Sequence, residues 1–265
     1  MILKRPFARA GLVAAVAMVL LSVGRLRAAE APIAPALSTL APVEDLVSQI
    51  EDYLKEVEES VEDQEEYEDS VEKIDRYSNS LAVVALAVGL HDQDSPLRKA
   101  TPALVKASQE LAGAKDFAGA KAGVAKIKAA LSASGDPSTL KWSKVASLPT
   151  LMKQVPLINT RLKRFLKPGR FEKNAAVIAG NSAALVAIGQ GSMPNAEETE
   201  APDRVADWFK YCVEMRDAAG ALNNAVHARN EDAAKTAMAA LQQSCDDCHT
   251  IFHKDAEKEV DSHKE

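Results

Sequence analysis

The residues best suited to chemistry lie together near the C-terminus, in the run Cys245-Asp246-Asp247-Cys248-His249. Two thiols three residues apart, followed at once by an imidazole, form the pattern typical of covalent haem attachment. Each thiol adds to one vinyl group of the same porphyrin, so the two thiols must lie about one helical turn apart. Positions three and four apart share a face of a helix, and the adjacent imidazole can then bind the iron as proximal ligand. We therefore expect one covalent haem c at this run.

The same residues also allow two other chemistries. A structural zinc ion takes four Cys or His ligands, and Cys212 and His253 could complete such a set. A disulfide between Cys245 and Cys248 would be ordinary in an exported protein. With three Cys and five His in 265 residues, the spacing favours haem over both. No nucleophile, acid–base pair or phosphate-binding loop stands out, so we expect that the protein is not an enzyme.

Residues 1–28 have the features of a secretory signal: a charged start, an apolar middle and small residues at the expected cleavage position. The apolar run is shorter than the ~20 residues of a bilayer-spanning helix, and a retained membrane anchor is the alternative. Cleavage would remove five basic residues and no acidic one, changing the net charge from −6 to −11. We expect a periplasmic protein, and an acidic protein of this kind is a poor nucleic-acid binder.

The rest of the chain predicts an all-α fold, because strand-like alternation is nearly absent and aromatic residues make up only 5%. Residues 29–42 contain three prolines and are expected to form an extended linker, and residues 189–202 a polar loop. We expect a long helix that begins at Val43 and a second helix that includes 81–90. The remaining helices are expected at 101–112, 117–133, 148–166, 171–188, 203–228 and 231–258.

The order of four helices occurs twice, and short stretches of sequence repeat with it. Asn79-Ser80 resembles Asn181-Ser182, and residues 115–121 resemble 229–235. The pattern predicts two tandem antiparallel four-helix bundles, at 43–136 and 140–258, that arose by duplication. The first half contains no Cys, so it cannot hold covalent haem.

A haem-attachment run on the last helix of a four-helix bundle resembles the class II c-type cytochromes, the cytochrome c′ and cytochrome c556 group. Phe252 matches the aromatic residue that follows the family's His by three positions, while His253 stands where the family has a basic residue. The resemblance implies a haem buried in the second bundle, with His249 as proximal iron ligand.

The resemblance also implies that the sixth iron position decides the function. Met152, in Leu151-Met152-Lys153 on the first helix of the second bundle, is similar to the Met-ligated branch and is the expected distal ligand. Ligation by Met152 favours one-electron transfer with an unknown redox partner protein. If Met152 is only core packing, an open iron would bind NO or CO. A zinc- or disulfide-stabilised helical interaction protein is the alternative from another class.

The first helices of the two halves have opposite charge. Residues 44–75 hold fifteen acidic residues, and residues 141–173 hold nine basic residues against Glu172. We expect that the halves pack as a covalent pseudo-dimer with these helices adjacent; the competing idea is that the basic face docks an acidic redox partner. Among the other candidates, Cys212 is expected to be buried, His91 to cap a helix, and His227 to be solvated.

Overall fold

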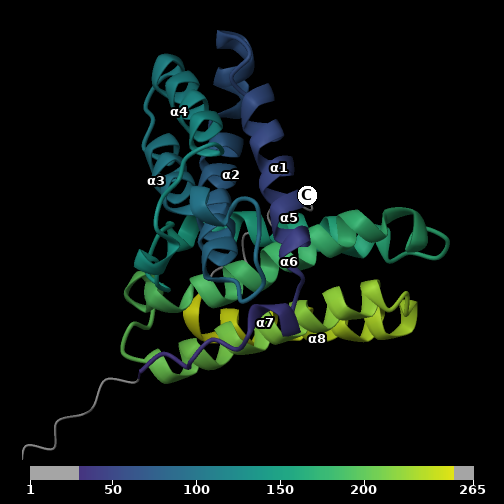
Figure 1. The fold of residues 1–265 in the computed structure, drawn as a ribbon. Coiled ribbons are helices and arrows are strands. Elements are labelled where there is room, and N and C mark those ends of the chain that lie inside the picture. Colours follow the sequence, from purple (N-terminus) through teal and green to yellow (C-terminus); the bar gives the residue numbers. More distant parts are fainter. Residues whose placement is uncertain (1–29, 254–265) are drawn as a thin grey trace, which may run out of the picture.

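The computed structural model describes residues 30–253, and every regular element in that range is a helix (Figure 1). The predicted all-α class is confirmed. None of these helices is both long enough and apolar enough to cross a membrane. The expected signal (1–28) and the end of the last helix near residue 258 lie outside the described residues. The α-helices are α1 Val43–Glu59, α2 Gln64–Leu90, α3 Thr101–Ala112, α4 Phe117–Ala130, α5 Leu148–Phe165, α6 Ala175–Gly191, α7 Val205–His227 and α8 Glu231–Phe252.

Short polar side chains begin three of these helices. The first amide groups of a helix have no partner within it, and a side-chain oxygen can accept from them. Asp63 accepts from the third residue of α2 at 2.9 Å, Asp116 from Gly119 N of α4 at 2.7 Å, and Asn230 from Ala233 N of α8 at 3.0 Å. Asp and Asn are among the residue types preferred at this position.

The helices form two groups that cross each other. In Figure 1, α1 to α4 stand across α6, α7 and α8. Consecutive helices are neighbours within each group, and α1 and α2 contact α6, while α5 touches α2, α6 and α8. One continuous apolar core includes buried side chains from both groups, such as Ile50, Leu86, Leu162 and Leu185. Helix α5, which carries part of the candidate site, shares this core and contacts helices of both groups.

Equivalent residues of the two halves make equivalent contacts. Asn79 and Asn181 each donate through Nδ2 to the carbonyl oxygen four residues earlier, at 2.9 and 2.7 Å. Asp116 and Asn230, the other pair of matched positions, both cap the last helix of their half. These contacts agree with an internal duplication, which stays a prediction.

The segment 30–42 does not behave as a free linker. Leu37 and Ala41 are buried in the main core, and Asn224 Nδ2 donates to Thr39 O at 3.0 Å. Leu40 lies so close to Gly220 of α7 that a Cβ there would stand 2.7 Å from Leu40 Cδ2. In Figure 1 this purple segment runs along α7. The prolines predict its extended start, but the apolar residues after them attach it to the body of the protein.

The prediction of a polar loop at 189–202 was wrong for the first part of that range. Helix α6 continues to Gly191, and residues Met193–Glu198 form a 3-10 helix. Asn195 is buried and donates to Ala146 O at 2.9 Å, and Trp208 Nε1 donates to Ser192 O at 3.2 Å. Contacts with residues outside the segment thus hold it against the body of the protein, although the buried Ser192 Oγ and Asn195 Oδ1 have no hydrogen-bond partner among residues 30–253.

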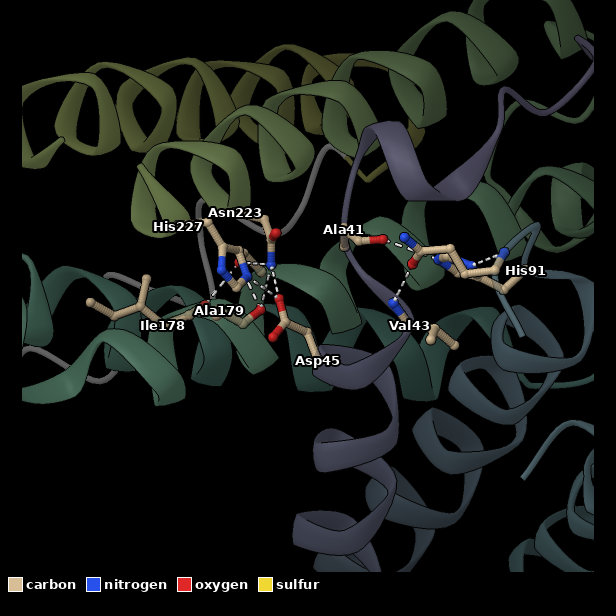
Figure 2. Close-up of polar contacts among 10 residues, drawn as sticks. Ala41, Val43, Asp45, His91, Ile178, Ala179, Asn223 and His227 are labelled. Carbon is tan, nitrogen blue, oxygen red and sulfur yellow. Dashed lines mark hydrogen bonds and ion pairs between the residues drawn. The ribbon is translucent and has the colours of Figure 1, made fainter. Parts of the chain in front are cut away.

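Polar contacts also fasten α1 to α7 (Figure 2). Asp45 Oδ2 lies 2.7 Å from His227 Nε2 and accepts from Asn223 Nδ2 at 2.7 Å. His227 is exposed, as predicted, but its ring also has a partner that is 182 positions away in the chain. His91 ends α2 as expected, but it is fully buried and its Nε2 lies 3.1 Å from Ala41 O.

Candidate haem-attachment site

The two thiols and the imidazole lie in the last two turns of α8. Cys245, Cys248 and His249 are each half-buried. All three cysteines of the chain are free thiols. Asn159 of α5 approaches the first thiol, with Nδ2 at 3.9 Å from Cys245 Sγ. The helix thus presents both thiols, one turn apart, toward the interior of the protein.

A small apolar cluster, separate from the main core, lies beside the second thiol. Its buried members are Leu148, Met193, Trp208, Phe209, Cys212 and Phe252. Cys248 and Met152 both pack against this cluster. The Trp208 and Phe252 rings meet edge to face with centroids 5.4 Å apart, which fixes α7 against the end of α8. Cys212 is buried here, as its sequence context predicts.

Two contacts show how α5 lies against α8. Asn159 reaches Cys245, and Lys163 Nζ donates to Gln242 Oε1 at 2.7 Å. A step of four residues forward on α5 therefore matches a step of three residues back on α8, so the helices are antiparallel. Met152 precedes Asn159 by two turns and thus lies level with the last turn of α8, in agreement with its packing against the cluster that includes Phe252. Met215 and Met238 instead belong to the main core.

Burial sets the protonation states of the site. It raises the pKa of Cys245, which the nearby Asn159 amide partly offsets, and raises the pKa of Cys248 to about 12. Burial and the neighbouring His253 lower the pKa of His249. At neutral pH both sulfurs are therefore thiols and the imidazole is uncharged, with a nitrogen lone pair available to a metal.

The donor set fits haem better than zinc. In the described part of the chain, no three His, Cys, Asp or Glu side chains are grouped so that they could hold a metal ion, so Cys212 and His253 do not complete a zinc set. Free thiols one turn apart beside a neutral imidazole are the groups that covalent haem requires. The buried Oδ1 of Asn159, next to Cys245, has no hydrogen-bond partner between residues 30 and 253.

The structure brings Cys248, Met152 and Phe252 to one cluster, whereas Cys245, one turn earlier on α8, packs against the main core, and His249 directly follows Cys248. Sequence reasoning missed Asn159 and Tyr211, whose ring lies 6.3 Å from the Phe252 ring. The spacing of seven residues between Met152 and Asn159 is a signal that could have placed Asn159 on the same face of α5.

Comparisons of the chain with protein-family models, with curated proteins and with solved structures found no match. The side chains that α5, α7 and α8 bring together are therefore the features from which a function can be inferred. Few groups bind two thiols and an adjacent imidazole at once.

Proposed function

We propose that the protein is an exported c-type cytochrome, similar to the class II group, that carries one haem c bound through Cys245 and Cys248. The observation that supports this most is the pair of free, half-buried thiols on one face of α8, next to an apolar cluster that also contacts Met152. Haem, when bound, supplies a reversible one-electron iron couple. The proposed activity is electron transfer with a redox partner protein, without enzymatic turnover.

Each residue of the site has a role in this proposal. His249, uncharged because it is buried, is the proximal iron ligand. Met152 is the proposed distal ligand, and a thioether at that position stabilises reduced iron. The Trp208 and Phe252 rings keep water away from the side of the site where Met152 lies. Asn159 holds its amide beside the Cys245 sulfur and orients it.

A second candidate is a cytochrome c′-like binder of NO or CO. The observation in its favour is that Met152 packs against both apolar clusters of the described chain, as a core side chain would. In that case the iron would keep one position open. The two candidates differ only in whether the Met152 sulfur reaches the metal, so one substitution separates them.

The remaining features of the proposal concern architecture. We propose that the chain is a covalent pseudo-dimer of two four-helix units, of which the N-terminal unit carries no haem. The contacts of α1 with α6, and of α2 with α5 and α6, support this arrangement, because they join the first two helices of each half. Export by a signal at residues 1–28 would place the protein in the periplasm, where c-type haem is attached.

Absorption spectra of the mature protein, produced with haem-attachment machinery, test the function. We expect a Soret band, and a reduced spectrum that carbon monoxide does not change. Met152→Ala should give a reduced spectrum that shifts with carbon monoxide, because the distal position is then open. Met215→Ala, a buried Met of α7 in the main core, is the control and should behave as the parent protein.

If the parent protein already shifts with carbon monoxide, Met152 is not a ligand and gas binding becomes the function. If no Soret band forms, the cytochrome proposal is wrong.

A further inference from the structure

Helix α5 carries a stripe of side chains on a face that is not used by the haem site. Lys153, Leu157, Arg161 and Arg164 are spaced by four, four and three residues, so they line one side of the helix. Met152 and Asn159 lie on a different side. We call these four residues the basic stripe. Leu157 is 50% exposed, which is unusual for a large apolar side chain in this protein.

The charges of the basic stripe are not neutralised within the described chain. Other lysines have carboxylate partners: Lys73 lies 2.9 Å from Glu56, and Lys128 lies 3.2 Å from Glu58. No such ion pair occurs for Lys153, Arg161 or Arg164 between residues 30 and 253, and the Arg164 guanidinium instead lies over the Phe165 ring, 4.7 Å from its centroid. A protein with a net charge of −6 thus keeps an unpaired basic surface.

A cleft of about 280 Å³ runs beside the stripe. It is lined by Tyr77 of α2 and by Gln154, Leu157, Arg161 and Arg164 of α5, among others, and no lining residue is acidic. Gln154 is buried, and its Oε1 has no hydrogen-bond partner among the described residues. The cleft therefore offers two guanidinium groups and an apolar contact within a small area.

We infer that the basic stripe and its cleft are the docking surface for a partner protein that presents acidic side chains around an apolar one. Guanidinium groups bind carboxylates through two parallel hydrogen bonds, which matches Arg161 and Arg164 to such a patch. Leu157 supplies the apolar contact at the centre. The identification of this partner as a redox protein rests on the proposed function.

The position of the stripe suits electron transfer. The stripe begins at Lys153, next to Met152, and a helix with its side chains is about 10–12 Å across, so the near end of a docked partner lies within about one helix diameter of Met152. An anionic membrane surface is less well matched. A helix that lies in a membrane interface needs a broad exposed apolar face, whereas the broad apolar face of α5, with Leu151, Val155 and Leu162, is buried.

The test measures, by anisotropy, binding of a fluorescently labelled peptide of alternating Glu and Leu to the mature protein produced with haem-attachment machinery. We expect binding that weakens as salt is added. The double substitution Arg161→Glu, Arg164→Glu should weaken it about tenfold or more. The control Lys99→Glu, Lys115→Glu makes the same change in net charge at exposed lysines outside the cleft and should change it less than about twofold.

Equal weakening by the two double variants would overturn the inference, because binding would then follow net charge alone. So would binding to phosphatidylglycerol vesicles but not to the peptide, or self-association through the stripe without peptide binding. The peptide assay does not depend on haem absorption. Stripe-dependent binding without a Soret band would keep the docking surface and remove the redox assignment, and a Soret band without stripe-dependent binding would do the reverse.

Discussion

Removal of the Asp45 carboxylate is expected to destabilise the protein by about 2 kcal/mol. Asp45 Oδ2 accepts from Asn223, which is fully buried, and from His227, which is about half exposed. A hydrogen bond from a buried group to a charge contributes about 1.5–3 kcal/mol, and a half-exposed ion pair only about 0.5 kcal/mol. In Asp45→Ala the Asn223 amide keeps its bond to Ala179 O at 2.9 Å, so no buried donor is orphaned and the lower part of the range applies.

Urea unfolding followed by circular dichroism measures this loss, with an unchanged m-value. Glu44→Ala is the matched control, because Glu44 lies in the same first turn of α1 but is exposed. It removes only a favourable charge at the helix N-terminus, which is worth about 0.3–1 kcal/mol. If Asp45→Ala and Glu44→Ala cost the same, the contact between α1 and α7 in Figure 2 does not stabilise the fold, and the reasoning is refuted.

Two further predictions concern packing and pH. Gly189→Ala should destabilise the protein by about 1 kcal/mol, because the new Cβ would lie 2.9 Å from Arg216 N. Gly180→Ala on the same helix is the control and should stabilise the protein by about 0.5–1 kcal/mol, because the atom nearest to its new Cβ is 3.4 Å away. Thermal unfolding measures both effects, and equal effects would contradict the close approach of α6 and α7. Burial of Glu198 opposes its ionisation, but hydrogen bonds from Lys144 and from the first amide of α5 outweigh it and lower its pKa below 4.5. The stability that ionised Glu198 contributes is therefore full above pH 4.5 and is lost as the pH falls through the lowered pKa. Glu198→Gln should reduce the free energy of unfolding at pH 7 and make it fall less steeply as the pH is lowered. An unchanged decrease of stability in acid would contradict this.

The sequence predicted the helices well where local signals decide them. Periodic apolar residues and caps such as Asp116 and Asn230 set helix positions through contacts within a few residues. The loop at 189–202 was misjudged, and the partner of His227 was missed, because Ala146 and Asp45 are far away in the chain. Local polarity cannot report a long-range hydrogen bond.

The candidate site also combines a local feature with features that depend on long-range contacts. The spacing of Cys245, Cys248 and His249 is a local feature, so the sequence alone predicts its chemistry. The antiparallel register of α5 and α8, which places Asn159 beside Cys245 and Met152 against the cluster that includes Phe252, depends on tertiary packing. Periodicity predicts which residues share a face, but it does not predict which face of another helix they meet.

The most direct test of the central claim is the intact mass of the mature protein, measured under denaturing conditions after production with haem-attachment machinery. The account predicts a mass increase of one haem that persists after unfolding. Cys245→Ala with Cys248→Ala should abolish the increase, and Cys212→Ala should retain it. A parent protein without this added mass, or a double variant that keeps it, would contradict covalent attachment at α8.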